Sequence, residues 1–239
     1  MTFQELPYQR PDFDALYAQG KELLARMEQA KTAQEYFDAA DAMDKLASGL
    51  STQYSLCHVR YAIDTRDPFY EKENDVFDEE MPRFQEFTAE IARITLESKF
   101  RDEIVNKYGK HLLEKFEVQR KVFKPEIVPD LVEENKLSTE YENLIASAQI
   151  AFDGGTYNLS GMTPFTQSKD RDVRHRANDA AWGWLAQQQD TLDKLYDNLV
   201  KVRHSIAKKL GYENFIPVAY ARMGRTDWNQ QDAQRYRAQ

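Results

Sequence analysis

Apolar side chains recur every three or four residues along most of this chain, which is the spacing of one face of an α-helix. Residues 12–30 carry this pattern after a proline and an aspartate suited to a helix start. A second run follows Thr32, a good capping residue, and continues to about residue 63. The two runs predict long amphipathic helices that pair antiparallel.

A third helical run covers residues 69–96, after a break at residues 64–68. Pro82 lies inside it and is expected to kink or divide the helix near Glu80, because proline lacks an amide hydrogen and clashes with the preceding turn. The carboxylates in the first half of this run are interpreted as one solvated acidic face: Glu71, Glu73, Asp75, Asp78, Glu79 and Glu80.

Shorter elements are expected in the middle of the chain. The pattern predicts helices around residues 100–108 and 111–122, separated by Gly109. Residues 125–134 are interpreted as a proline-interrupted connection, and a further helix is predicted over residues 138–148.

The periodicity changes from three or four residues to two at residues 149–152. Asp153, Gly154 and Gly155 form a strong hairpin-turn signal, and residues 156–159 alternate again. A two-stranded hairpin is marginal alone, so it must pack against helices or join a sheet outside the segment. The predicted fold is therefore mostly α, a multi-helix elongated assembly with one short β-hairpin near residues 149–159.

The last third of the chain returns to helical spacing. We predict helices over residues 168–189, capped by Ser168, and over residues 190–210, ended by Gly211. A short helix and a turn follow, and Asp227 or Asn229 is expected to cap a final helix from residue 230. That helix shows no end signal, so residues 212–239 are expected to be the least ordered part. Their apolar side chains are expected to be partly exposed, namely Phe215, Val218, Tyr220 and Trp228.

Composition and charge narrow the class of protein. The chain has 239 residues, of which 30% are charged and 41% hydrophobic, which is too apolar for disorder and too polar for a membrane protein. Its net charge of −8 is spread without a basic face, which argues against nucleic acid as a partner. Residues 1–11 lack the apolar core of a secretory signal, and Cys57 is a lone cysteine. We expect a cytoplasmic protein.

Candidate chemistry is sparse. None of the four histidines is followed by glutamate, so the His-Glu-x-x-His helix of zinc peptidases is absent. Asp172 and His175 have metal-ligand spacing, but they lack a second such pair, so a surface ion pair near Arg174 and Arg176 is favoured. Cys57 is interpreted as a buried structural cysteine. No catalytic residue, metal ligand or stoichiometric zinc is expected in this chain alone.

One cluster near the end of the chain could bind a ligand. Arg222 and Arg225 flank Gly224 and are bracketed by Tyr220 and Trp228. Arginines in such a place could bind a carboxylate or fix the turn to a neighbouring helix. On the residues alone, the structural alternative is favoured.

At residues 202–215, Val-Arg-His-Ser-Ile-Ala-Lys-Lys-Leu-Gly-Tyr-Glu-Asn-Phe, the sequence resembles the oligoendopeptidase F branch of the thimet oligopeptidase-like zinc metallopeptidases. The Tyr-Ala-Arg-Met-Gly-Arg of residues 220–225 is similar as well. Upstream, the segments at residues 64–73, 133–138 and 150–160 are similar to segments that occur in the same order in that family's N-terminal region. The resemblance therefore spans nearly the whole chain.

The resemblance implies a mostly helical enzyme whose two lobes enclose a deep channel for short peptides. It also implies that zinc is held by two histidines of a His-Glu-x-x-His helix and a later glutamate, all beyond residue 239. Residues 1–122 would then form an N-terminal helical region, residues 123–189 the oligoendopeptidase F-type N-terminal domain, and residues 190–239 the start of the zinc peptidase domain. A non-catalytic helical interaction protein derived from that family is the alternative.

Six residues are predicted to contact peptide substrate in the complete enzyme, where the chain would form part of the channel wall. Three lie in the hairpin and three in the arginine-containing turn: Ile150, Ala151, Phe152, Tyr220, Arg222 and Arg225. The hairpin is included because an exposed strand edge can pair with the backbone of an extended peptide.

Overall fold

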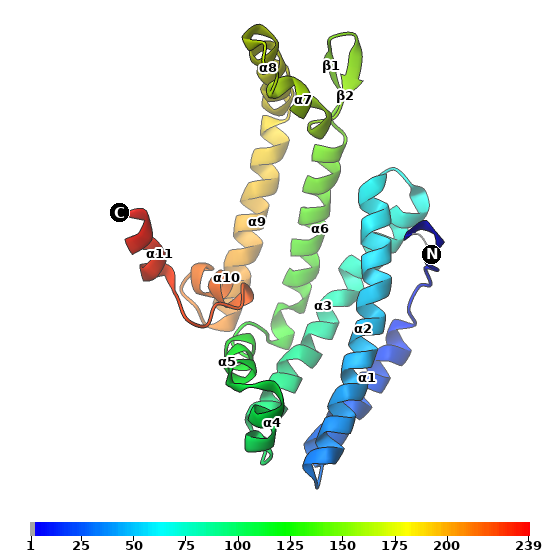
Figure 1. The fold of residues 1–239 in the computed structure, drawn as a ribbon, viewed down its shortest axis with the longest axis vertical. Helices are drawn as coiled ribbons and strands as arrows, with labels where there is room; N and C mark the ends of the chain where they lie inside the picture. The colour runs from blue at the N-terminus through cyan, green and yellow to red at the C-terminus, as the bar shows by residue number, and fades with distance from the viewer. Residues whose placement is uncertain (1–2) are drawn as a thin grey trace. The chain divides into compact units, whose positions relative to one another are not determined.

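A computed structural model describes residues 3–239, in which α-helices dominate and two short strands form an antiparallel sheet (Figure 1). The chain divides into two compact units. The first unit comprises the residues up to 132 together with residues 204–239, and the second unit comprises residues 133–203. The mostly helical class and the single hairpin are confirmed.

The long elements of the first unit are three helices, followed by shorter ones. In chain order, the helices of this unit are η1 (Phe3–Glu5), α1 (Phe13–Gln29), α2 (Ala33–Ile63), α3 (Pro68–Leu96), α4 (Arg101–Tyr108), α5 (Lys110–Gln119), η2 (Pro125–Ile127), α10 (Ile216–Arg222) and α11 (Gln230–Arg237). The second unit holds β1 (Ile150–Phe152), β2 (Gly155–Tyr157), η3 (Ser160–Met162), α7 (Thr163–Thr166) and α8 (Arg171–Gln187). Residues of α6 (Val128–Ala146) and α9 (Gln189–Leu210) belong to both units.

The starts of the first three helices follow from their capping residues. The Asp12 carboxylate accepts a hydrogen bond from the amide of Ala15, and the Thr32 hydroxyl accepts one from the amide of Glu35 at 3.2 Å. Asp67 caps α3. The first residue of α3 is Pro68, and its missing amide hydrogen costs nothing there, because amides in the first turn of a helix have no partner within the helix. These caps confirm the predicted beginnings of α1 and α2, and the two helices pack side by side (Figure 1).

The core of the first unit is rich in aromatic rings contributed by α1 and α3. Phe13 packs edge-to-face on Phe77, with ring centroids 5.4 Å apart, and Phe84 packs on Phe87 at 5.6 Å. These four rings are buried, and each such pair adds about 1 kcal/mol beyond the burial of its area. The apolar faces of α1 and α3 therefore hold the two helices together mainly by packing.

Gly20 lets α1 approach α3 closely, because a Cβ atom there would lie 2.6 Å from two ring carbons of Phe87. We expect Gly20→Ala to destabilise the protein by about 1–2 kcal/mol, since overpacking outweighs the better helix propensity of alanine. Gly49 in α2 is a matched control, because its Cβ would meet nothing within 4 Å. Gly49→Ala should stabilise by up to about 1 kcal/mol. Urea unfolding measures both, and equal shifts would contradict the close-packing argument.

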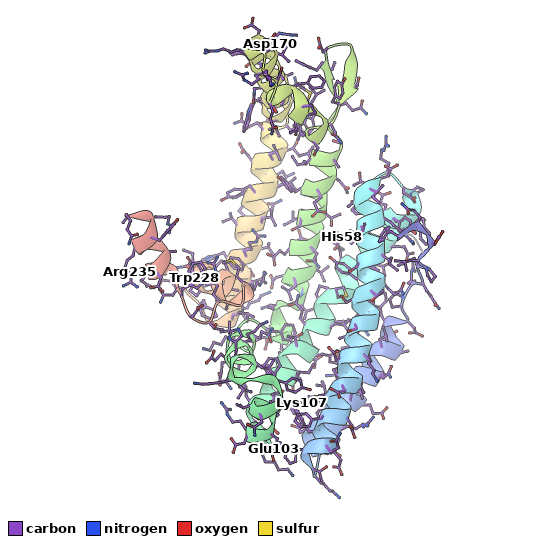
Figure 2. The ribbon with its side chains drawn as sticks, viewed as in Figure 1. His58, Glu103, Lys107, Asp170, Trp228 and Arg235 are labelled. Atoms are coloured by element: carbon purple, nitrogen blue, oxygen red, sulfur yellow. The ribbon has the colours of Figure 1, made fainter. Side chains whose placement is uncertain are left out.

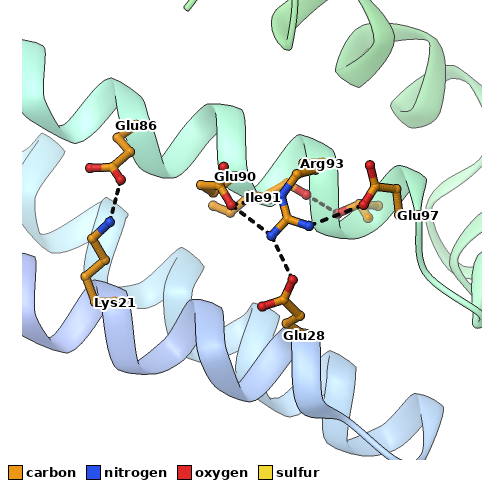
Figure 3. A network of polar contacts seen from close by, with 8 residues as sticks. Lys21, Glu28, Glu86, Glu90, Ile91, Arg93 and Glu97 are labelled. Atoms are coloured by element: carbon orange, nitrogen blue, oxygen red, sulfur yellow. Dashed lines mark hydrogen bonds and ion pairs between the residues drawn. The ribbon is translucent and has the colours of Figure 1, made fainter. Parts of the chain in front are cut away.

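Surface ion pairs join α1 to α3 beside this core, as Figure 3 shows. Arg93 of α3 reaches Glu28 of α1 at 2.8 Å and also contacts Glu90 and Glu97 on its own helix. Lys21 pairs with Glu86 further along the same interface. Because such pairs are partly exposed, each contributes roughly 0–1 kcal/mol and mainly fixes the register of the two helices.

Three expectations for this region are wrong. Pro82 was expected to kink or divide its helix, but it does not divide it, because α3 runs unbroken from Pro68 to Leu96 with Pro82 buried inside it. The solvated acidic face does not include Glu73, which is 4% exposed. The expected connection at 125–134 is helical from Val128 onward, since a proline is tolerated in a first turn.

A second, smaller core in the first unit holds α10 in place. Val218 is fully buried against Ile127, Leu131 and Ile206, so the expectation that this valine is exposed is wrong. The Asp130 carboxylate accepts a hydrogen bond from the Ser205 hydroxyl at 3.0 Å beside this core. The short helix is therefore docked by packing rather than left free.

In the second unit, α6 and α9 pack through Leu137, Leu195 and Val202. The Arg203 guanidinium lies 2.7 Å from the Glu134 carboxylate beside them. The hairpin packs on α8, and the side chains of Ile150, Phe152 and Ala177 are buried together in one cluster. The start of α8 is capped by Asp170 rather than by the predicted Ser168, which instead accepts a hydrogen bond from the Asp170 amide.

Within residues 3–239, no helix combines the length and the apolar character needed to cross a lipid bilayer.

Candidate functional site

The hairpin forms at the predicted residues. β1 and β2 pair antiparallel with Ile150 opposite Tyr157, Ala151 opposite Thr156 and Phe152 opposite Gly155. The two turn residues between the strands both have positive φ, 49° at Asp153 and 83° at Gly154. Two positive φ angles define the turn that matches the twist of a two-residue hairpin, and Asp-Gly is a favoured sequence for it.

The three hairpin residues predicted to contact substrate face different ways. Ile150 and Phe152 are buried, and the Arg176 guanidinium lies over the Phe152 ring at 5.4 Å. Ala151 is exposed on the other side of the strand. Because successive side chains of a β-strand point to opposite faces, Ile150 and Phe152 belong to the core and Ala151 to the surface.

The backbone of Ala151 forms part of an outer strand edge. In an antiparallel hairpin closed by a two-residue turn, the pair next to the turn exchanges hydrogen bonds and the following pair does not. Phe152 and Gly155 are the closing pair, so Ala151 and Thr156 form the pair without mutual hydrogen bonds. The N–H and C=O groups of Ala151 therefore point away from β2, and those of Thr156 point away from β1.

The arginine-containing turn in the first unit is ordered by its own backbone. Gly224 has φ 66°, its amide donates to the Ala221 carbonyl at 2.9 Å, and the Arg225 amide donates to the Tyr220 carbonyl at 3.4 Å. This pair of bonds around a left-handed glycine is the Schellman ending of a helix. It turns the chain back so that Arg225 lies over the last turn of α10.

The side chain of Arg225 stacks on two aromatic rings. Its guanidinium carbon lies 3.7 Å from the centre of the Trp228 ring and 4.6 Å from that of Tyr220, and the two rings meet edge-to-face at 5.8 Å. Arg222 lies instead over Phe215 at 5.2 Å. The two arginines of the predicted cluster therefore have different surroundings.

Arg225 lines a pocket of about 520 Å³ between the end of α10 and α11. Figure 2 labels Trp228, in the segment that leads into α11, and Arg235 on that helix. The other lining residues are Tyr220, Trp228, Asp232, Ala233, Tyr236 and Arg237. The pattern at residues 220–228 pointed to Tyr220, Arg225 and Trp228 but not to α11, whose residues lack any chemical motif.

Asp232 is the one carboxylate that lines this pocket, and local contacts occupy it. It accepts a hydrogen bond from the Asn229 amide at 2.8 Å and pairs with Arg235. The amide hydrogen bond and the Arg235 guanidinium lower the pKa of this carboxyl below its usual range. The Asn229 side chain in turn accepts a hydrogen bond from the Asp232 amide at 3.2 Å, and this reciprocal pair is a capping box, which confirms Asn229 as the cap of the final helix.

The residues that the structure describes do not fit a zinc site. Within residues 3–239, no three histidine, cysteine, aspartate or glutamate side chains come together to hold a metal. His175 pairs with Asp179 at 2.8 Å on the exposed face of α8, rather than with Asp172. Cys57 is fully buried as expected, and burial raises the pKa of its thiol to about 12.

Comparison with known proteins identifies the family. Residues 3–123 match the family model described as the Peptidase M3 N-terminal domain. Pz peptidase A, solved with an inhibitor, is 39% identical over 99% of the chain, with a TM-score of 0.96. A structure described as oligoendopeptidase F is 42% identical over 100% of the chain, with a TM-score of 0.97. Another so described, from Bacillus anthracis, is 39% identical over 100%, with a TM-score of 0.95. A search of curated proteins gave no significant match.

The chain therefore belongs to the M3 peptidases. Within that family it corresponds to the N-terminal part of a peptidase of the oligoendopeptidase F type, as the resemblance predicted. The chain spans 42% of the length of the first two matched structures and 44% of the third. The alternative of a non-catalytic interaction protein is not favoured.

Proposed function

We propose that this chain is the N-terminal part of a zinc metalloendopeptidase that hydrolyses short peptides, and that it forms part of the substrate channel wall. The observation that carries the proposal is an identity of 39–42% across essentially the whole chain to M3-type peptidases, one of them solved with an inhibitor. The zinc ligands belong, in this proposal, to the part of the enzyme outside these 239 residues. The lone buried Cys57 supports a cytoplasmic location.

The metal requirement tests this proposal on the longer protein. We expect it to cleave a fluorogenic peptide of about ten residues, to lose activity after treatment with a chelator, and to regain it with zinc, because its family's catalysis depends on a bound metal. The 239-residue chain alone should show neither cleavage nor one bound zinc per chain. Activity that resists metal removal would contradict the metallopeptidase proposal, and cleavage by the chain alone would contradict its inactivity.

The role proposed for the hairpin is to pair with the backbone of an extended peptide. Ala151 is exposed, and its N–H and C=O lie on the outer edge of β1, where they are positioned to extend the sheet by one strand. Such pairing recognises main-chain groups, so it suits an enzyme that accepts many short sequences. The buried Ile150 and Phe152 would hold the strand on α8 rather than contact substrate directly.

Ala151→Pro in the longer enzyme tests this role, because it removes one outward N–H without breaking a hydrogen bond of the hairpin. We expect KM to rise about tenfold, the effect of losing one hydrogen bond worth roughly 1.4 kcal/mol, with kcat less affected.

Thr156→Pro is the matched control, since it removes the corresponding N–H from the edge of β2. Its KM should stay unchanged. An unchanged KM in a folded Ala151→Pro enzyme would reject the role of this edge, and a rise for Thr156→Pro alone would move substrate pairing to the other strand.

A further inference from the structure

The Arg225 guanidinium contacts two aromatic rings, and within residues 3–239 its N–H groups donate no hydrogen bond. Its carbon is 3.7 Å from the centre of the Trp228 ring, so one face of the planar group rests on that ring. Stacking uses the face of a guanidinium, whereas its five N–H groups point outward in its plane. The Tyr220 ring, whose centre is 4.6 Å from the guanidinium carbon, faces one part of this edge. A ligand that approaches the rest of the edge can accept two parallel hydrogen bonds.

The pocket that contains Arg225 has an excess of positive charge. Over residues 3–239, neither Arg225 nor Arg237 forms an ion pair, although both line the pocket. The contacts of Arg237 include a hydrogen bond to the Ala233 carbonyl at 3.3 Å. The charge of Asp232 is balanced by Arg235. Two guanidinium charges thus remain uncompensated at a pocket of a protein whose net charge is −8.

Exposed aromatic surface surrounds these charges. Trp228 is 42% exposed and Tyr236 is 79% exposed, and both line the same pocket. The pocket thus offers a guanidinium edge, an excess of positive charge and exposed aromatic rings. A ligand that matches it has a planar anion, which binds the guanidinium edge, and apolar groups beside the anion, which pack on the rings. A peptide with a carboxylate has both, because the neighbouring side chains can lie on the rings.

We propose that the pocket between α10 and α11 is a carboxylate-binding site for peptides, with Arg225 as its main hydrogen-bond donor and Arg237 as a second positive charge. The carboxylate is either the free C-terminus of a peptide or an acidic side chain. This inference rests on the proposed function, in which peptides are the substrates, and it adds a preference for peptides that carry a negative charge.

The test uses the 239-residue chain and three acetylated pentapeptides of alanine and leucine. One ends in a free carboxylate, one in an amide, and one in an amide with a central glutamate. Binding is followed through the indole N–H signal of Trp228 in a nitrogen-15 spectrum, assigned with Trp228→Phe. The free-carboxylate or the glutamate peptide should bind at least about tenfold more tightly than the neutral amide, the effect of a charge-assisted hydrogen bond.

Arg225→Gln should abolish this difference, and Arg225→Lys should reduce it, since lysine cannot donate two parallel hydrogen bonds. Arg26→Gln on α1 is the matched control, because it removes one exposed positive charge elsewhere and should leave binding unchanged. Unshifted methyl signals of Val218 and Ile206, which are buried in the same unit, verify that each variant is folded. Arg237→Gln, on the exposed helix α11, gives a second test with an expected weakening of about threefold or more.

The results with the three peptides either assign the site or overturn the inference. Tighter binding of the free-carboxylate peptide assigns the site to peptide C-termini, and tighter binding of the glutamate peptide assigns it to acidic side chains. Equal binding of all three peptides, no shift at millimolar concentrations, or unchanged binding by Arg225→Gln would overturn the inference. Peptide cleavage by the longer enzyme does not enter this test, so the proposed function can fail or stand independently of it.

Discussion

Replacing Glu73 by alanine is expected to lower the free energy of unfolding by about 3 kcal/mol, because it removes the centre of a buried polar cluster. The Glu73 carboxylate is 4% exposed and accepts a hydrogen bond from the Tyr8 hydroxyl at 2.5 Å. Arg10 donates to it from two nitrogens: the single N–H of Nε is shared between the two carboxylate oxygens at 3.0 and 3.1 Å, and Nη2 donates to one of them. These contacts join the segment before α1 to α3, 63 and 65 residues further along the chain.

The loss has two physical parts. The alanine removes three charge-assisted hydrogen bonds, and it leaves the partly buried Tyr8 hydroxyl without its acceptor. The segment stays attached through Arg60, which donates to the Leu6 carbonyl at 2.6 Å and to the Tyr70 hydroxyl at 2.9 Å. We therefore expect a less stable protein that still folds.

The same cluster gives a pH dependence with a definite sign. The Arg10 guanidinium lowers the pKa of Glu73, and the Tyr8 hydrogen bond adds to this, although burial opposes it. A carboxyl whose pKa is depressed by folding contributes stability above its unfolded pKa of about 4.3, and that contribution disappears as the pH falls through the folded value. The difference in stability between the parent chain and Glu73→Ala should therefore shrink below about pH 4.

Urea unfolding at pH 7 and pH 3.5 measures these effects. Glu73→Gln is an informative companion, because it keeps the shape and one acceptor while removing the charge, so its loss should be smaller than that of alanine. Asp64→Asn is the control, since Asp64 pairs with Arg66 on the surface and its removal should change stability little. A loss for Glu73→Ala no greater than for Asp64→Asn would contradict the buried-cluster account.

Local signals in the sequence predicted most helix boundaries of this fold. Asp12, Thr32 and Asn229 cap the helices expected of them, and Gly211 ends α9. The Tyr212 amide donates to the Ala207 carbonyl at 2.8 Å around that glycine, as in a Schellman ending. Each of these interactions joins residues within about one helical turn, so a single sequence contains all the information it needs.

The errors arose where packing over long distances decides the structure. Proline at position 82 was expected to kink or divide α3, but the helix continues through it, because buried rings before and after it along the helix offset the missing hydrogen bond. Ser138 resembled a helix start, yet it lies inside α6, where its hydroxyl donates to the Glu134 carbonyl. Glu73 looked like a surface residue because its partners Tyr8 and Arg10 are distant in sequence.

The candidate site was predictable in its composition but not in its geometry. The aromatic and arginine pattern at residues 220–228 identified side chains that could form a ligand site. Only the structure separates Arg225, which lines a pocket, from Arg222, which lies over Phe215. The Schellman turn at Gly224 explains the difference, because it reverses the chain between the two arginines. The substrate contacts of all six residues stay predictions.

Amide hydrogen exchange should distinguish α11 sharply from the helices that precede it. No residue of α11 is buried, and a helix of eight residues gains little stability in water without packing, even with the capping box of Asn229 and Asp232. Its amides should exchange within about tenfold of the rate of an unstructured peptide. Those around Ile206 and Ala207 of α9, which are fully buried, should exchange at least about 10³-fold more slowly. The exchange rates of α10 should resemble those of α9, since Val218 is fully buried in the same core.

Amide exchange is measured by nuclear magnetic resonance on the monomeric chain, with sedimentation to exclude association. Protection of α11 equal to that of α9 would mean that α11 is held by contacts stronger than its exposed surface indicates.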